Sequence, residues 1–385
     1  MRLQYCVRCV LPDSKPDLRI DENGVCAACR AYENRAEIDW EARKAEFLDI
    51  VERYRDQTNA KWDCIVPVSG GKDSTIQILK MLELGVRPLA VTATTCDLTP
   101  IGQANIDNIR SLGVDHVTLS PNPVVRRKLN RIGLEEVGDI SWPEHVGIFT
   151  IPIRAAVDFG VPLIIWGENS QNEYGGPAAA VKSRVLDRRW LEEFGGLLGL
   201  RVSDLEGRLG ITAGDLAPYT YPTGEMLDAA GITGYFLGQF FPWDGLSNAL
   251  LAQAHGFRTW GKTIEGSMVD YENLDNYQTG IHDYFKFLKF GFGRATDIAS
   301  LHIRRGRISR EQGLEIVKQH DGRYPSTYLD KPLAKILAPL GMPVAQFDEI
   351  CDRFTNKSIF KTNRDGSLRR EADGSLVKID YDNRA

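Results

Sequence analysis

The chain has 385 residues, enough for about two or three domains, and its composition of 43% hydrophobic and 26% charged residues is that of a globular protein. Its formal net charge of −5 gives no overall cationic field that would attract nucleic acid, although a local basic patch would escape this test. No apolar run has the length of a transmembrane helix and the N-terminus lacks the apolar core of a signal peptide, so we expect a cytoplasmic protein with no transmembrane segment and no nucleic-acid partner.

Four of the seven cysteines lie near the N-terminus, in two Cys-x2-Cys pairs. Cys6 and Cys9 form the first pair and Cys26 and Cys29 the second, which is the spacing of a four-thiolate zinc site. Four soft thiolates suit tetrahedral zinc and leave no ligand position open. The sequence therefore predicts a structural zinc ribbon over residues 1–35, with a redox pair or a chance arrangement as the alternatives.

The next part of the chain changes from a charged helical pattern to an alternation of strands and helices. We expect a linker helix within residues 36–60. After it, the predicted strands are 64–68, 88–94, 114–119 and 162–166, and the predicted helices are about 74–84, 101–112, 123–136 and 143–159. This alternation predicts an α/β fold with a doubly wound parallel sheet over residues 61–180, and ligands bind such sheets at the carboxyl ends of the strands.

The most informative motif directly follows the first predicted strand. It consists of Ser69, Gly70, Gly71, Lys72, Asp73 and Ser74. Glycines allow a sharp turn and a close approach to a ligand, and the amide groups at the start of the next helix form an anion site. The motif is not a Walker A loop, because Asp73 stands where that loop has Ser or Thr. It resembles the pyrophosphate loop of the ATP-pyrophosphatase (PP-loop) superfamily, whose members cleave ATP between the α- and β-phosphates.

Two other strand ends carry polar residues. Thr92 and Thr94 end the second predicted strand, where PP-loop enzymes hold adenosine largely through backbone groups. Glu168, Asn169 and Asn172 follow the last one, and their carboxylate and amide oxygens suit Mg²⁺ or a polar acceptor. The alternative for Glu168 is the first turn of a helix, with no ligand.

The rest of the chain predicts a mostly helical substrate or partner domain over residues 181–360 and a hairpin or tail over 361–385. We expect most of the aromatic run at 235–244 to be core. A glycine-rich turn precedes Arg294, which is a candidate for stabilising charge on a leaving pyrophosphate. Asp297 and His302 follow as candidates for binding substrate or Mg²⁺. A surface loop with a basic helix is the alternative.

Residues 5–33, 166–176 and 289–317, together with the loop, resemble the N-acetyl sugar amidotransferases of bacterial O-antigen and flagellin-glycan biosynthesis. The resemblance implies an AMP-forming enzyme that uses ATP and Mg²⁺. ATP adenylates the acetamido oxygen of a nucleotide-linked N-acetyl sugar, and ammonia displaces AMP to give an acetamidino sugar. By this resemblance the loop holds pyrophosphate, and we take Lys72, Asp73, Glu168 and Arg294 as the catalytic candidates.

The cysteines bear on the source of ammonia and on the rival functions. Position 2 is Arg rather than the Cys of a class II glutaminase, and Cys64, Cys96 and Cys351 lack a nucleophile elbow. The resemblance therefore implies free ammonia or a separate glutaminase subunit as partner, and a homo-oligomer stays open. One rival is a PP-loop tRNA-thiolating enzyme, with Cys96 as the sulfur-handling candidate. A non-catalytic ATP-binding scaffold is the other, and the intact loop counts against it.

Overall fold

A five-stranded parallel sheet forms the centre of the fold. The computed structural model describes residues 3–33, 35, 38–57, 60–168 and 198–379. The strands are β1 (Cys64–Pro67), β2 (Pro88–Ala93), β3 (Asp115–Leu119), β4 (Leu163–Trp166) and β5 (Thr233–Phe236). Their order across the sheet is β3-β2-β1-β4-β5, and all neighbours are parallel. The chain therefore reverses its direction across the sheet between β1 and β4, which is the position where doubly wound folds bind ligands.

Side chains alternate between the two faces of the sheet along each strand, so apolar residues point to both faces. Helices cover each face and bury these residues. The side chains of Cys64 and Val66 pack into one core with Phe47 of α2 (Trp40–Gln57). Between them, Ile65 packs into the opposite core with Ile153 of α6 (Trp142–Phe159). The four strands from β1 to β4 match the predicted apolar runs, and the predicted α/β class is confirmed.

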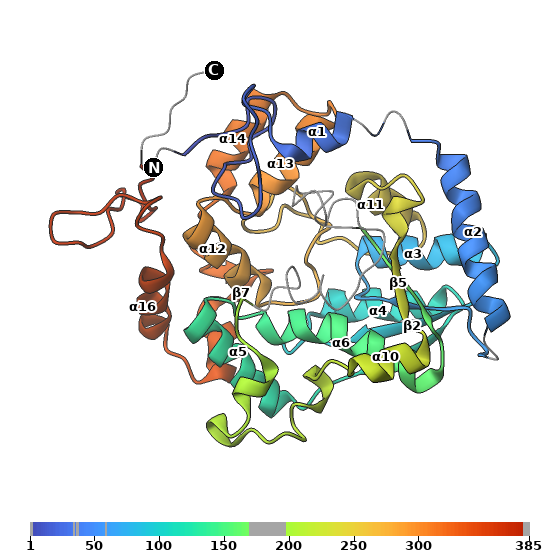
Figure 1. The fold of residues 1–385 in the computed structure, drawn as a ribbon. Coiled ribbons are helices and arrows are strands. Elements are labelled where there is room, and N and C mark those ends of the chain that lie inside the picture. Colours follow the sequence, from blue (N-terminus) through green and yellow to red (C-terminus); the bar gives the residue numbers. More distant parts are fainter. Residues whose placement is uncertain (1–2, 34, 36–37, 58–59, 169–197, 380–385) are drawn as a thin grey trace.

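Most of the other elements are helices (Figure 1). The α-helices are α1 (Ala27–Glu33), α3 (Lys72–Glu83), α4 (Pro100–Ser111), α5 (Pro123–Val137), α10 (Gly224–Ala230), α11 (Gly245–Ala254), α12 (Thr279–Phe290), α13 (Arg294–Arg304), α14 (Arg310–His320), α15 (Leu333–Leu337) and α16 (Val344–Phe354). Two short antiparallel strands, β6 (Thr327–Tyr328) and β7 (Lys331–Pro332), lie among them. The C-terminal region is therefore mostly helical, as predicted.

Local sequence signals explain several helix ends. Thr99 caps α4 by accepting a hydrogen bond from the amide of Gly102 (2.8 Å), and Pro100 occupies the first helical position. Ser309 and Gln312 form a capping box at the start of α14. At the end of α5, Gly138 takes the left-handed conformation (φ 61°) that terminates many helices.

The structure differs from the sequence predictions at two places around the sheet. The fifth strand, β5, comes from residues 233–236, so the sheet extends beyond the segment 61–180 in which it was expected. Its last two residues, Tyr235 and Phe236, begin the aromatic run of which we expected most to be core, and a four-residue strand carries too little periodicity to be separated from such a run. The helix within 36–60 is also more than a linker, because α2 covers one face of the sheet.

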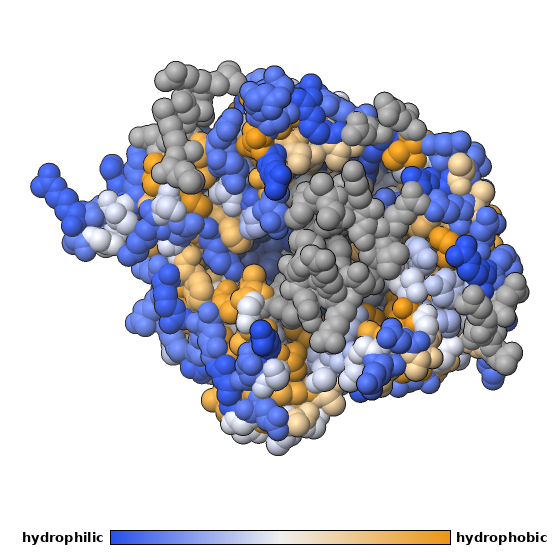
Figure 2. Space-filling view, in the orientation of Figure 1, coloured by the Kyte–Doolittle hydropathy of each residue, from blue (hydrophilic) through white to orange (hydrophobic). Residues whose placement is uncertain are grey.

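On the face that Figure 2 shows, the outer rim of the molecule is mainly hydrophilic. Apolar side chains gather below the centre of that view, in the part where Figure 1 places α5 and α6. Val124 on α5 and Ile148 on α6 are exposed apolar residues of these helices. Within the described part of the chain, no helix combines the length and the apolar character that crossing a bilayer requires.

Candidate functional site

A polar cavity of about 180 Å³ lies at the carboxyl ends of β1 and β4, where the strand order reverses. One wall is the predicted loop at residues 69–74, and Glu168, directly after β4, also lines it. The opposite wall comes from the C-terminal region, in a segment at residues 271–275 and in Arg294. The remaining lining residues are Gly102, Asn105 and Phe257. Residues that are far apart in the chain thus meet at one edge of the sheet.

The loop packs closely against α4. As a result, Gly70 cannot be replaced by a larger residue unless the backbone of the loop or of α4 moves. Gly70 has a φ of +83°, and a Cβ atom on it would lie 2.7 Å from the backbone nitrogen of Ile106 in α4. Gly71 caps α3 without a side-chain hydrogen bond, and the hydroxyl of Ser74 donates to its carbonyl oxygen (3.0 Å). The start of α3 thus has no side-chain cap and lines the cavity, which is the arrangement of an anion site at a helix N-terminus.

Lys72 lies in this cavity within a network of carboxylates. Its ammonium group is 2.6 Å from a carboxylate oxygen of Asp73 and 3.1 Å from one of Glu272. The amide of Asn248 on α11 donates to the other oxygen of Asp73 (2.8 Å). Burial would raise the pKa of Glu272, but the charges of Lys72 and Arg294 outweigh it and hold that pKa below its usual value. The cavity therefore contains a buried lysine and an ionised carboxylate side by side.

Arg294 contributes a second fixed positive charge. Its guanidinium donates two hydrogen bonds to Asp283 of α12, at 3.2 and 2.9 Å. Although burial lowers the pKa of Arg294, the carboxylate of Asp283 raises it well above its ordinary value, so the guanidinium stays charged. A bidentate pair fixes the direction of both groups, and Arg294 is thereby held at the cavity wall.

A second cavity, of about 330 Å³, lies beside the first at the ends of β2 and β3. Helix α4 separates them, since Gly102 and Asn105 line the first and Gln103 and Ile106 line the second. Thr94 lines this second cavity and its hydroxyl donates to that of Ser120 (3.0 Å).

Thr92 and Cys96 differ in how far they are open to a ligand here. The hydroxyl of Thr92 is buried inside the sheet and donates to the carbonyl oxygen of Val68 (2.8 Å), so it is not free for a ligand. Cys96 lines the second cavity, and burial raises the pKa of its thiol to about 11. A thiol with that pKa is almost fully protonated at neutral pH and is a weak nucleophile.

The other predicted site residues lie elsewhere. Asp297 is buried in α13 and pairs with the ammonium group of Lys286 from α12, outside the cavity. His302 is also on α13 away from the cavity, and burial, together with Arg307, lowers its pKa. Asn169 and Asn172 fall outside the described residues. Conversely, Glu272 and Asn248 were not singled out from the sequence, where Glu272 is one of several acidic residues in a short run.

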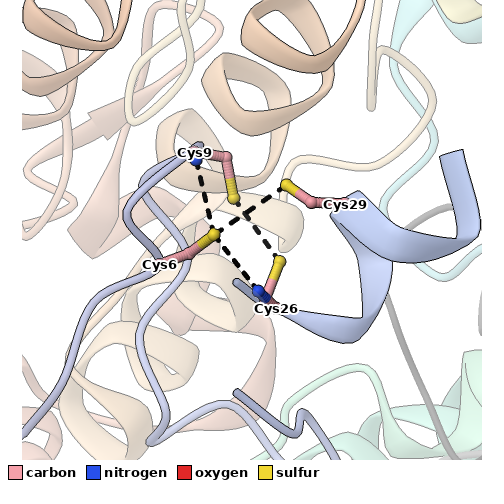
Figure 3. Close-up of side chains that lie close together, drawn as sticks. All are labelled: Cys6, Cys9, Cys26 and Cys29. Carbon is pink, nitrogen blue, oxygen red and sulfur yellow. Dashed lines mark hydrogen bonds between the residues drawn. The ribbon is translucent and has the colours of Figure 1, made fainter. Parts of the chain in front are cut away.

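The Sγ atoms of the four N-terminal cysteines come together, all within 4.8 Å of one another (Figure 3). The Sγ atoms of Cys6 and Cys29 are 3.9 Å apart, and those of Cys9 and Cys26 are 3.7 Å apart. Four sulfurs each about 2.3 Å from a zinc ion would lie about 3.8 Å from one another, whereas a disulfide needs about 2.05 Å. The amides of Cys9 and Cys26 point at the Sγ atom of Cys6 (3.5 and 3.3 Å), as they would at a thiolate. The cluster could therefore hold zinc.

The cysteine cluster is attached to the C-terminal helices. The guanidinium of Arg310 on α14 donates to the carbonyl oxygens of Cys6 (3.3 Å) and Cys9 (3.1 Å). Ile303 of α13 packs against the apolar residues around the cysteines. Figure 1 shows α1 beside α13 and α14, on the same side of the molecule. The cluster thus supports α13, which carries Arg294 at its first position.

Parts of the chain are similar to a protein family and to solved structures. Residues 265–372 match the model of the family described as "LPS biosynthesis protein WbpG-like, C-terminal domain". No curated protein matches the chain. A solved structure of NMN synthetase from Francisella tularensis aligns with 50% of this chain and 93% of its own, at 13% identity and a TM-score of 0.27. At that TM-score, the fold assignment rests on the strand order and not on this similarity.

Proposed function

We propose that this protein is an ATP-dependent, AMP-forming amidotransferase that acts on a nucleotide-linked N-acetyl sugar. The observation that carries the proposal is the loop at residues 69–74, which includes Lys72 and lines a polar cavity at the strand-order reversal together with Arg294. The match of the C-terminal region to an LPS biosynthesis family supports a sugar as substrate. The product would then serve surface polysaccharide or flagellin-glycan synthesis.

In this reaction the acetamido oxygen attacks the α-phosphorus of ATP and pyrophosphate leaves. Ammonia then attacks the amide carbon, and AMP leaves with the original oxygen, so that an acetamidino group replaces the acetamido group. The amides after Gly71, with Lys72 and Arg294, would bind the phosphates and stabilise the negative charge that develops on pyrophosphate. The nucleoside would extend past α4 into the second cavity, beside Thr94.

The cavity also fits a magnesium ion bound with the phosphates. Asp73, Glu168, Glu272 and Asp275 all line it, and carboxylate oxygens are the ligands that Mg²⁺ takes beside a nucleotide. Magnesium would neutralise phosphate charge, while Asn248 keeps Asp73 in place. We assign zinc, in a purely structural role, to Cys6, Cys9, Cys26 and Cys29.

Ammonia would come from solution or from a separate glutaminase subunit. Burial raises the pKa of the thiols of Cys64, Cys96 and Cys351, which argues against each of them as a glutaminase nucleophile. The same raised pKa argues against Cys96 as the sulfur carrier of a tRNA-thiolating enzyme.

The decisive experiment measures pyrophosphate release by the purified protein with ATP, Mg²⁺ and an ammonium salt, over a panel of nucleotide-linked N-acetyl sugars. We expect release that depends on one sugar, with AMP formed in equal amount and a product in which NH has replaced oxygen by mass. Turnover only with tRNA and a sulfur donor would establish thiolation instead. ATP binding without turnover under any of these conditions would establish a scaffold.

A further inference from the structure

A second cluster of metal-binding side chains lies outside the phosphate cavity and outside the cysteine site. It consists of Asp139, between α5 and α6, His145 on α6, and His282 on α12. One ligand atom from each of the three lies within 4.8 Å of the other two. His145 and His282 are 137 positions apart along the chain, so only the fold brings them together.

The geometry of the cluster directs both imidazoles at one carboxylate. The Nδ1 atom of His282 lies 2.8 Å from Oδ1 of Asp139, and that of His145 lies 3.0 Å from Oδ2. The two rings are nearly perpendicular, with centroids 4.9 Å apart and an angle of 76°. Two ligand atoms that are each about 2.1 Å from one zinc ion lie about 3.0–3.4 Å apart. The two nitrogen–oxygen distances in the cluster are therefore close to those between neighbouring ligands of one metal ion.

One nitrogen in the cluster contacts the carboxylate of Asp139 without the alignment of a good hydrogen bond. The Nδ1 atom of His145 is buried, and although it is close to Asp139 it makes no hydrogen bond of acceptable geometry in the structure. An imidazole nitrogen and a carboxylate oxygen at this distance suit either a direct ion pair or two ligand positions of one metal ion. A metal ion between the two groups would satisfy both.

The surroundings hold the carboxylate rigidly in place. Asp139 is 2% exposed, and its Oδ1 atom also accepts a hydrogen bond from the amide of Ser141 (2.9 Å). Its own amide donates to Gly133 (3.0 Å). The nearby cation is Lys289, whose ammonium group donates to the carbonyl oxygen of Val137 (3.3 Å). The positive charge of Lys289 weakens the attraction of the cluster for a metal cation. The negative charge of the buried Asp139 carboxylate acts in the opposite direction and strengthens that attraction.

We propose that Asp139, His145 and His282 bind a divalent transition-metal ion, for which zinc is the best match. Two imidazole nitrogens and one carboxylate oxygen are a donor set that zinc prefers and magnesium does not. Three protein ligands leave one tetrahedral position for water or another ligand, in contrast to the closed cysteine site. The proposal stands independently of the reaction proposed above.

Such a metal would join the two halves of the molecule close to the phosphate cavity. Asp139 and His145 belong to the part of the chain that forms the sheet, and His282 is on α12 in the C-terminal region. The next residue, Asp283, forms the ion pair with Arg294. A metal at His282 would therefore also fix the start of the helix that orients Arg294.

The first test counts zinc ions in the purified full-length protein after stripping, reloading with excess zinc and removal of unbound metal. His145→Gln and His282→Gln are compared with the natural sequence, and His255→Gln, an exposed histidine, is the matched control. We expect each cluster variant to hold about one zinc ion fewer per chain, a change from about two to about one if the cysteine site is also loaded. Equal zinc content in all four proteins would overturn the proposal.

The second test needs no variant, so a folding defect cannot confound it. X-ray absorption at the zinc edge of the reloaded natural protein reports the atoms bound to zinc. We expect a mixture of sulfur and of nitrogen or oxygen neighbours. Sulfur neighbours alone would mean that zinc occupies only the cysteine site, and Asp139 would then be the centre of a hydrogen-bonded histidine cluster without a metal.

Discussion

Of the two glycines in the loop, Gly70 has less room for an added methyl group. In Gly70→Ala, the Cβ atom would meet the backbone of Ile106 at 2.7 Å and of Asn105 at 2.9 Å. Neither backbone can yield without moving α4, so the loop must shift. We expect ATP to bind at least about tenfold more weakly, which is about 1.4 kcal/mol, measured by titration calorimetry.

Gly85 provides the matched control for this substitution. It also has a positive φ, of +68°, but a Cβ atom there would meet nothing within 4 Å. Gly85→Ala should therefore share the cost of the left-handed conformation, about 1–2 kcal/mol of stability, and leave ATP affinity unchanged. If both variants lost the same affinity, the close approach of the loop to α4 would have no part in binding.

Glu272 is the second residue whose role can be isolated. Replacing it in Glu272→Gln removes the carboxylate 3.1 Å from the ammonium group of Lys72 while keeping the shape of the side chain. Lys72 would then keep its ion pair with Asp73 and lose the one with Glu272. We expect the rate of pyrophosphate release to fall about 10- to 100-fold, a loss typical of a misplaced catalytic group.

Asp270 belongs to the same acidic run and does not belong to the cavity lining, so Asp270→Asn is the control. We expect its rate of pyrophosphate release to match that of the natural protein. If the rate of pyrophosphate release fell equally in the two variants, the cause would instead be the general loss of a negative charge near the site.

At the scale of secondary-structure elements, the sequence was most informative where one element carries its own signal. Apolar runs of strand length predicted β1 to β4, and the glycine-rich turn after β1 predicted an anion site at the start of α3. The fifth strand escaped because Thr233–Phe236 is short and runs into aromatic residues. Contacts between elements that are distant in the chain leave no local pattern in the sequence. Lys72 and Glu272, for example, are 200 positions apart, so no short segment contains both.

The junction of α2, β1 and β2 shows how one carboxylate can hold three elements together. Asp63, just before β1, accepts hydrogen bonds from the guanidinium of Arg55 on α2 (2.8 Å) and from the amide of Arg87 before β2 (2.8 Å). Burial would raise the pKa of Asp63, but Arg55 and Arg87 lower it to about 2. The ionised form is therefore favoured by folding.

This linkage makes the stability of the junction depend on pH. The pKa of Asp63 is lower in the folded protein than its ordinary value of 3.8, so its stabilisation is complete above that value and is lost as the pH falls toward 2. Asp63→Asn should reduce the free energy of unfolding by about 2 kcal/mol at pH 7, and the difference should roughly halve by pH 3. Urea unfolding of both proteins at each pH measures it.

Asp49, an exposed acidic residue of α2, supplies the comparison. Asp49→Asn should change the free energy of unfolding by no more than about 0.5 kcal/mol at either pH. A difference between Asp63→Asn and the natural protein that stayed constant from pH 7 to pH 3 would mean that the charge of Asp63 is not what stabilises the junction.

On the scale of the whole molecule, the phosphate cavity is built from both halves of the chain. The sheet region supplies the loop and Glu168, and the C-terminal region supplies residues 271–275 and Arg294. The same two regions share a hydrophobic core, in which Ile76 of α3 and Leu134 of α5 pack with Ile281 and Phe285 of α12. Neither half alone forms the cavity, so binding in it should stabilise contacts across the molecule.

Hydrogen exchange with and without ATP and Mg²⁺ tests this coupling directly. A ligand at 100 times its dissociation constant stabilises the state it binds by about 2.7 kcal/mol, which slows exchange from any opening that breaks the site. We expect slower exchange both at residues 69–74 and at residues 271–275, although the two segments are about 200 positions apart. Helix α10 contributes nothing to the cavity lining and serves as the internal reference. Slower exchange confined to residues 69–74 would mean that the phosphates contact the sheet region alone, and Glu272 and Arg294 would then lose their place in the proposed reaction.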